Sequence, residues 1–149
     1  MLFRSKYFET FPKVRVYLDN VLEQAQEDEY AESAFGRRRY LPALSSGVQM
    51  VRASAERMAK NMPLQGTASD IMKMAMIAVD KWINTEGFDD DVKLLLQVHD
   101  ELVLEVKADL VEKVSDKLKE IMEKVASFEV PLTVDVEVGD NWKEMKLSA

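Results

Sequence analysis

Residues 92–106 read VKLLLQVHDELVLEV, two runs of strand-forming residues that meet at His99, Asp100 and Glu101. Branched and aliphatic residues favour β-strands, so the stretch predicts a hairpin. Its tip lacks the Asn-Gly or Asp-Gly pair of a tight turn, whose central residues need positive φ. Because broken local rules tend to mark functional sites, the tip is a candidate site.

The two carboxylates at this tip predict a divalent-cation site. Asp100 and Glu101 are hard oxygen ligands, which Mg²⁺ and Mn²⁺ prefer, and the strands below would hold them in place. Two-metal phosphoryl transfer needs such carboxylates to hold its ions about 4 Å apart. A polar turn without chemistry is the alternative, and the residues alone leave both interpretations open.

The sequence after the hairpin predicts an α+β fold. Residues 130–138, VPLTVDVEV, alternate strictly between apolar and polar side chains and predict a strand. An apolar stripe between Leu110 and Val125 predicts a helix. We therefore expect a small antiparallel sheet, made of hairpin 92–106 plus strand 130–138, packed on helices.

The sequence before the hairpin predicts mainly helices. Apolar residues at helical spacing cover residues 5–28, where Pro12 interrupts or starts the helix, and two short extended segments follow around Gly36. Further helices are predicted over 49–61 and 64–84, with Pro63 disturbing the backbone between them. The 64–84 helix is apolar nearly all round and is therefore expected to be largely buried.

Charge is distributed unevenly along the 149 residues. The net charge of −7 argues against a free-standing nucleic-acid binder, which needs Lys and Arg to neutralise phosphates. Residues 1–66 carry 10 basic and 8 acidic side chains, whereas residues 67–149 carry 10 and 19. Between Arg37 and Lys60, six basic residues accompany one acidic residue, and this basic band is a candidate phosphate-binding surface or an ordinary solvated face.

Composition also excludes several classes of site. The absence of cysteine excludes disulfides, thiolate metal sites and a thiol nucleophile. No apolar run reaches the roughly 20 residues of a membrane span, so no membrane partner is expected. The first residues are too charged for a secretory signal, which favours a cytoplasmic location.

A row of hydrogen-bond donors is predicted near residue 60. Arg57, Asn61 and Gln65 are spaced by four residues, so on a continuous helix they drift by only about 80°. Minor-groove edges present purine N3 and pyrimidine O2 acceptors at similar positions in every base pair. Such a row could therefore detect correct pairing geometry without preferring a sequence, although a solvated helix face gives the same spacing.

Taken together, four segments closely resemble bacterial family A (polymerase-I-type) DNA polymerases. They occur in the family's order and cover the chain from about Tyr7 to Trp142. The segments are FGRRRYLP, RASAERMAKNMPLQGTASDIMKMAMIAV, LLLQVHDELVLEV and VPLTVDVEVGDNW.

The resemblance implies specific roles and partners. Asp100 matches the second metal-binding aspartate of the palm, with Mg²⁺ or Mn²⁺ as cofactor, and Glu101 matches its acidic catalytic neighbour. His99 matches a residue close to the primer terminus, and the donor row matches residues that contact primer-template DNA. Arg52 is similar to a backbone-contacting arginine. Deoxynucleoside triphosphate is the other implied partner.

Two family segments are missing from the sequence. It contains no DYSQIE-like strand with the first palm aspartate, and no RxxxKxxxFGxxYG-like fingers helix that grips the nucleotide. The resemblance therefore implies half of a palm with adjoining fingers helices, divided into fingers-derived residues 1–48 and palm residues 49–149. We expect the isolated chain to hold the metal weakly and to be inactive, and a separate chain could supply the remainder.

Two other functions remain open at this point. A non-catalytic DNA-binding or structural module could retain the palm fold and bind DNA through the basic band. A metal-dependent phosphoesterase could use Asp100 and Glu101, although the further His and Asp ligands of such sites are lacking.

Overall fold

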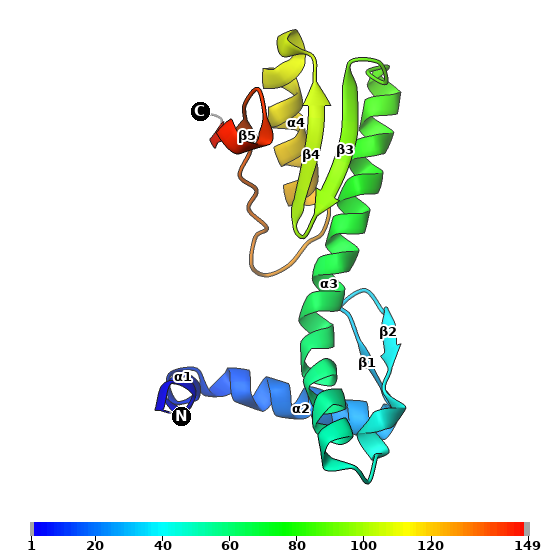
Figure 1. Ribbon diagram of the computed structural model, residues 1–149, viewed down its shortest axis with the longest axis vertical. Helices are drawn as coiled ribbons and strands as arrows, with labels where there is room; N and C mark the ends of the chain where they lie inside the picture. The colour runs from blue at the N-terminus through cyan, green and yellow to red at the C-terminus, as the bar shows by residue number, and fades with distance from the viewer. Residues whose placement is uncertain (1, 148–149) are drawn as a thin grey trace. The chain divides into compact units, whose positions relative to one another are not determined.

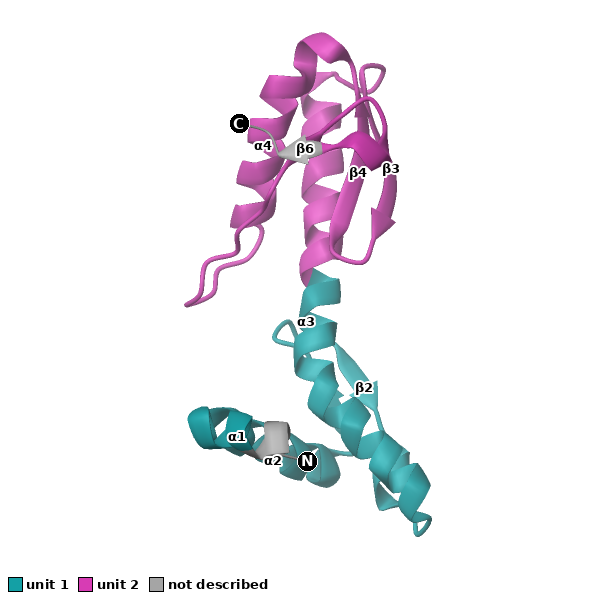
Figure 2. Cartoon of the chain, turned by 60° about the vertical axis from the view of Figure 1, so that its left-hand side comes forward, with its two compact units in different colours: residues 1–70 teal, residues 71–149 magenta. Residues whose placement is uncertain are grey.

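The computed structural model describes residues 2–147, without the side chains of residues 2–5, 146 and 147. The chain divides into two compact units, residues 1–70 and 71–149, which are coloured separately in Figure 2. The mixture of helices and small antiparallel sheets in Figure 1 confirms the predicted α+β class. The division into fingers-derived and palm residues at 48/49 stays a prediction, because compactness does not test it.

Unit 1 joins two helices, a short hairpin and the first part of a long helix. Its elements are α1 (Leu2–Thr10), α2 (Pro12–Asp28), β1 (Tyr30–Glu32), β2 (Arg38–Tyr40), the 3₁₀ turn η1 (Pro42–Ser45) and the start of α3 (Gln49–Glu86). Pro12 begins α2, where its missing N–H costs nothing, so the predicted interruption is confirmed. Ala25 of α2, Ala31 of β1, Leu44 of η1 and Ala59 of α3 form the centre of the core.

A buried carboxylate ties the β1–β2 loop to α3. Asp70 is 6% exposed; it accepts hydrogen bonds from the Ser33 hydroxyl at 2.7 Å and the Arg37 Nε at 2.5 Å. The Ala34 N–H donates to the Thr67 hydroxyl at 2.9 Å. Gly36 takes φ 81° in this loop, a left-handed conformation that suits glycine. We call Ser33, Arg37, Thr67 and Asp70 the loop clamp; no sequence pattern predicted it.

Helix α3 is continuous, and the predicted break at Pro63 is wrong. The helix runs from Gln49 to Glu86 with Pro63 inside it. A proline removes one backbone donor but leaves its own carbonyl available, and here Thr67 donates its hydroxyl to the Pro63 carbonyl. The packing of Ala59 and Met62 into the core holds the helical path on the N-terminal side of the proline.

Unit 2 packs a hairpin against two helices. Its elements are the end of α3, β3 (Val92–Val98), β4 (Glu101–Val106), the 3₁₀ turn η2 (Ala108–Leu110), α4 (Val111–Lys124), β5 (Glu137–Val138), the 3₁₀ turn η3 (Trp142–Glu144) and β6 (Lys146–Leu147). The largest fully buried side chains are Val79, Val92 and Val114, one each from α3, β3 and α4. The predicted hairpin over 92–106 is confirmed.

The second half of α3 is less buried than predicted. Ala75, Val79 and Ile83 lie in the core, but Ile77 is 69% exposed. A helix that is apolar all round needs cover on every side, and unit 2 covers only one face.

The strand expected over 130–138 is mostly absent. Only Glu137–Val138 form a ladder, and they pair with Lys146–Leu147 in a separate two-stranded sheet rather than with the hairpin. The alternation predicted for the segment still holds in part, since Leu132, Val134 and Val136 are half-buried while their neighbours are exposed. The apolar period therefore set which side chains turn inward, but it did not supply a hydrogen-bonding neighbour.

Candidate active site

The tip of the β3–β4 hairpin is a two-residue turn made by His99 and Asp100. Val98 pairs with Glu101, so only these two residues connect the strands. His99 has φ 52°, whereas Asp100 is not among the left-handed residues; positive φ at the first central position alone is the pattern of a type II′ turn. Glycine normally fills that position, and a histidine there stores about 1–3 kcal/mol of backbone strain.

The two candidate catalytic carboxylates are presented to solvent. Asp100 and Glu101 are both exposed, and neither has an ion-pair partner within the described part of the chain. The tip therefore brings together His99, Asp100 and Glu101 as predicted. Among the described residues, however, no group of three or more metal-ligating side chains gathers.

A β-bulge in β3 sets the direction of the residues near the tip. The pairs Leu94–Leu104 and Leu96–Val103 differ by one residue in register, so Leu95 is the extra residue. Leu96 consequently leaves the face that packs on the core and is 49% exposed. The apolar run of β3 is thus covered on one face only within unit 2.

The bulge also gives Gln97 a role that the sequence analysis did not assign. Gln97 lies opposite Leu102, which packs against the core of unit 2, so both occupy the same face of the hairpin. The Gln97 side-chain amide donates to the carbonyl of His99 and thereby braces the strained turn. The only signal in the sequence was a polar residue two positions before the turn.

The donor row occupies one face of unit 1. Arg57, Asn61 and Gln65 are all exposed on α3, and because the helix continues through Pro63 their four-residue spacing keeps them aligned. Arg57 has no ion-pair partner among the described residues. The row is thus available to a ligand rather than to the protein's own acids.

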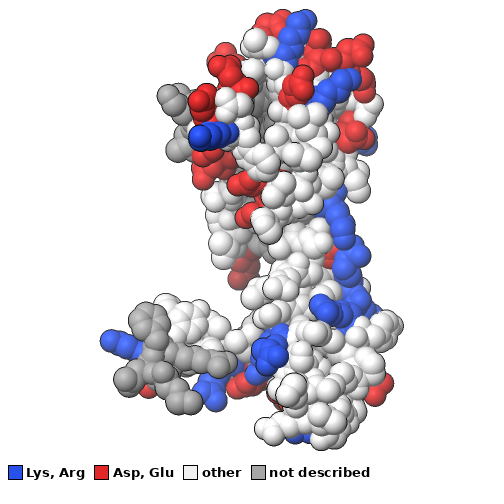
Figure 3. Space-filling model, viewed as in Figure 1, with Lys and Arg blue, Asp and Glu red and all other residues white. Residues whose placement is uncertain are grey.

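The other side chains of the basic band are mostly paired. Arg37 contacts Asp70, Arg38 contacts Glu32 at 2.8 Å, and Lys60 contacts Asp19 at 3.3 Å. The hydrogen bond that Arg38 donates to the Glu32 carboxylate raises the pKa of Arg38 above its usual value. On unit 1 as drawn in Figure 3, Lys and Arg outnumber the acids, whereas the visible face of unit 2 is rich in Asp and Glu.

Arg52, a predicted DNA-contacting residue, is held by partners within the protein. Its Nη1 donates to the Ser46 carbonyl at 3.2 Å, and its Nε lies 3.9 Å from Glu56. These partners hold the side chain half-buried along α3, so a ligand would compete with them.

Comparison with known proteins identifies a family. The family model of DNA polymerase family A matches residues 2–144. The chain is 48% identical over 140 residues to DNA polymerase I of Pseudomonas aeruginosa and 49% identical over 144 residues to the thermostable DNA polymerase I of Thermus filiformis. These matches cover 94% and 97% of this chain but only 15% and 17% of those relatives.

A solved structure shares the fold. The POL domain of Pol1 from M. smegmatis, in complex with DNA primer-template and dNTP, superposes with a TM-score of 0.82 at 44% identity. The match covers 87% of this chain and 22% of that one. Within residues 2–147, no helix has the length and apolar content needed to cross a membrane.

Proposed function

This chain belongs to DNA polymerase family A, and from that premise we propose that it supplies one part of the active site of a DNA-directed DNA polymerase. The observation that carries the proposal is the pair of exposed carboxylates at the braced tip of the β3–β4 hairpin. The other partners are primer-template DNA and a deoxynucleoside triphosphate. The cytoplasmic location stays a prediction.

The proposed reaction is template-directed nucleotidyl transfer. The 3′-hydroxyl of the primer attacks the α-phosphate of the nucleotide, the bond to the β-phosphate breaks, and pyrophosphate leaves. Mg²⁺ or Mn²⁺, when bound, would neutralise the phosphates and polarise the reacting oxygens. The oxygen donors of Asp100 and Glu101 fit such an ion, because Mg²⁺ takes one or two protein carboxylates and completes its shell with water and phosphates.

Each remaining residue has a binding role in this proposal. His99, next to Asp100, lies beside the primer terminus. Arg57, Asn61 and Gln65 donate to minor-groove acceptors of the newly paired bases, which reports pairing geometry rather than sequence. Arg52 contacts a backbone phosphate after leaving its carbonyl and carboxylate partners.

Residues 1–149 alone are proposed to be inactive, and a separate chain could supply the remaining parts. Two carboxylates that adjoin in sequence offer too few ligands for two ions about 4 Å apart. The sequence carries neither the DYSQIE-like strand nor the nucleotide-gripping helix of the family. The complete catalytic arrangement then requires the remainder of the palm and fingers.

Primer extension tests this proposal directly. The chain alone should give no template-dependent product with Mg²⁺ or Mn²⁺, and adding a polypeptide with the missing palm and fingers should restore it. In the restored enzyme, Asp100→Asn should lower the rate by about a hundredfold or more, because it removes an anionic ligand at the reacting phosphates. Asp90→Asn changes an exposed aspartate at the other end of the hairpin and should leave the rate unaltered.

A non-catalytic DNA-binding module is the second candidate, and the exposed donor row favours it. Such a module would bind primer-template DNA but would be indifferent to Asp100. Mn²⁺ binding separates the two: in electron paramagnetic resonance titrations, a retained half-site binds the ion weakly and loses it in Asp100→Ala. Unchanged Mn²⁺ binding in that variant, together with extension that is never restored, would favour the module.

A further inference from the structure

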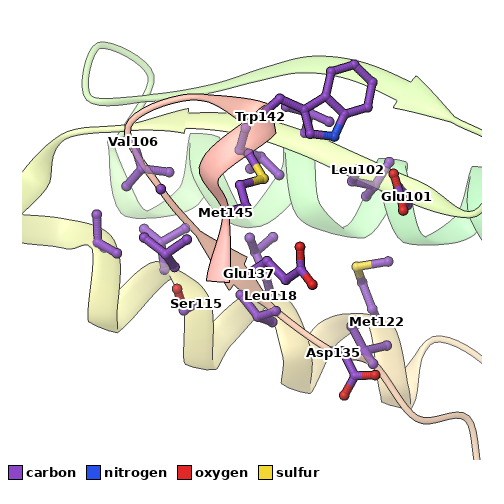
Figure 4. Close-up of a pocket in the computed structure, with 18 of the residues that line it drawn as sticks. Glu101, Leu102, Val106, Ser115, Leu118, Met122, Asp135, Glu137, Trp142 and Met145 are labelled. Atoms are coloured by element: carbon purple, nitrogen blue, oxygen red, sulfur yellow. The ribbon is translucent and has the colours of Figure 1, made fainter. Parts of the chain in front are cut away.

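Two methionines on the first half of α3 are exposed to solvent. Met50 is 82% exposed and Met58 is 40% exposed, whereas the other methionines that the structure describes are buried or half-buried. Met122 and Met145, for example, line a hollow of unit 2 between β4 and α4 (Figure 4). Oxidation of a thioether requires access for the oxidant, so Met50 and Met58 are the candidate sites of modification.

Met58 is in contact with a charged side chain from another element. Its thioether sulfur accepts a hydrogen bond from Nη2 of Arg39 at 3.3 Å. Arg39 lies on β2 opposite Ala31, which is buried in the same core cluster as Ala59 of α3. Directly opposed residues share one face of a strand pair, so Arg39 extends from the face that packs on α3.

The contact involves a part of the basic band that is available to a ligand. Arg37, Arg38, Arg52 and Lys60 each contact an acidic side chain. Arg39 is exposed and, within the part of the chain that the structure describes, forms no ion pair. Its charge is therefore available to a phosphate, and its contact within the protein is with a sulfur atom.

The strength of this contact depends on the oxidation state of the sulfur. A thioether is a weak hydrogen-bond acceptor, so it holds the guanidinium loosely. A sulfoxide is polar, and its oxygen carries the negative end of the S–O dipole. Oxidation of Met58 would strengthen the hydrogen bond from Arg39 and place a partial negative charge beside it. Both changes oppose phosphate binding by Arg39, although the net charge of the protein is unaltered.

We propose that Met58 is a reversible peroxide-modification site, and that its oxidation draws Arg39 away from DNA phosphates. The sulfur attacks one peroxide oxygen, the O–O bond breaks as the S–O bond forms, and the second oxygen leaves as water with the remaining protons. The sulfur loses two electrons and the peroxide is reduced. Methionine sulfoxide reductases reverse the step by oxidising two thiols to a disulfide. The effect on DNA rests on the proposed function, whereas the modification does not.

The modification is tested on the full chain without DNA. Met50→Leu removes the other exposed methionine, and this protein is treated with hydrogen peroxide. Peptide mass spectrometry should find the added oxygen on Met58 before it appears on the half-buried methionines. In NMR spectra, rotation of the Arg39 guanidinium should be slower in the oxidised form. The further variant Met58→Leu keeps the size of the side chain and should show no slowing after peroxide treatment.

The consequence is tested by binding to a primer-template duplex at fixed salt concentration. Oxidation should weaken binding about three- to tenfold, the range expected for interference with one charge-assisted hydrogen bond, and reduction of the sulfoxide should restore it. Met58→Leu should protect binding from peroxide, and Met58→Gln, which carries an amide oxygen, should weaken binding without it. In Arg39→Gln the same oxidation should have little further effect, because the two residues act together.

Three results would overturn the inference. The first is oxidation of Met58 no earlier than the half-buried methionines. The second is an unchanged Arg39 guanidinium in the sulfoxide form. The third is an equal loss of DNA affinity in Met58→Leu after peroxide treatment, which places the effect at another methionine. If oxidation slows Arg39 but the chain binds no primer-template at all, the proposed function and its DNA contact are rejected and the modification site stands. DNA binding that is indifferent to oxidation rejects the effect on phosphates and leaves the proposed function intact.

Discussion

The β1–β2 and β3–β4 hairpins reverse the chain in opposite ways. The β1–β2 hairpin reverses over five residues, places Gly36 at its left-handed position and fixes its loop to α3 through buried Asp70. The β3–β4 hairpin reverses over two residues, places His99 at its left-handed position and presents Asp100 and Glu101 to solvent. Buried hydrogen bonds stabilise the first hairpin, whereas the second keeps a strained backbone and exposes its carboxylates.

The contrast distinguishes carboxylates that stabilise the fold from carboxylates that are available to a ligand. A carboxylate with its hydrogen bonds satisfied inside the protein, such as Asp70, contributes to folding. A carboxylate held at a braced and strained turn without an internal partner is available for a ligand. Exposure and backbone conformation together separate the two cases, whereas residue type alone does not.

Removing the loop clamp should have the largest effect on stability. Asp70→Ala leaves the Ser33 hydroxyl without its acceptor in a buried site and frees Arg37, so we expect a loss of about 2–3 kcal/mol. Hydrogen exchange of unit 1 amides measures the loss locally. Asp80→Ala, at an exposed position of the same helix, should change stability little; comparable losses in both variants would mean that the clamp is unimportant.

Substitutions at Gly36 and His99, the two residues with left-handed backbone in the hairpin loops, should change the free energy of unfolding in opposite directions. Gly36→Ala forces a Cβ into left-handed backbone and should cost about 1–2 kcal/mol. His99→Gly relieves the same strain and, after the extra entropy of unfolded glycine, should gain about 0.5–1 kcal/mol. Hydrogen exchange of each hairpin gives both values.

Gly47→Ala is the control for this pair, because Gly47 has no positive φ and no atom within 4 Å of the added methyl group. The free energy of unfolding of Gly47→Ala should lie within about 0.5 kcal/mol of that of the original protein. If His99→Gly lowers the stability of the hairpin, the contacts of the imidazole stabilise the turn by more than the backbone strain destabilises it.

The smallest effect concerns acid pH at α4, which supports the second hairpin. Hydrogen bonds from Lys117 and then Lys124 lower the pKa of Glu120 from 4.5 to about 2. A lowered folded-state pKa stabilises above about pH 4.5, and this contribution is lost as pH falls from there to about 2. The carboxylate is fully exposed, so the gain is small.

Carboxyl NMR titration checks the value. Lys117→Gln should move the Glu120 midpoint upward, whereas Lys119→Gln, on the same helix, should leave it in place. A midpoint near 4.5 in the original protein would contradict the contacts at 2.8 and 3.0 Å.

Much of the fold follows from residue patterns, and the exceptions have physical causes. The two strand-forming runs over 92–106 and the proline at residue 12 predicted the second hairpin and the start of α2. Pro63 does not break α3, because the packing of Ala59 and Met62 into the core holds the helix together around the missing donor. The strand predicted over 130–138 is mostly absent, because a strand needs a hydrogen-bonding neighbour as well as an alternating sequence.

The candidate site was predictable in its composition but not in its conformation. The unusual turn sequence identified His99, Asp100 and Glu101, and helical spacing aligned Arg57, Asn61 and Gln65. The left-handed φ of His99, the brace from Gln97 and the bulge at Leu95 depend on backbone register, which no single residue type reports. The loop clamp escaped notice because Asp70 lies 33 residues after Arg37 and one aspartate in an apolar helix has no distinctive spacing.

The extra residue makes β3 one residue longer than its partner without moving the tip. If Leu95 were deleted, Leu96 would still lie opposite Val103 and Gln97 opposite Leu102, so the amide that braces the turn would keep its face. In an evolving gene, one lost codon here would therefore remove the local bend and twist of the bulge and leave the side chains of the tip in place.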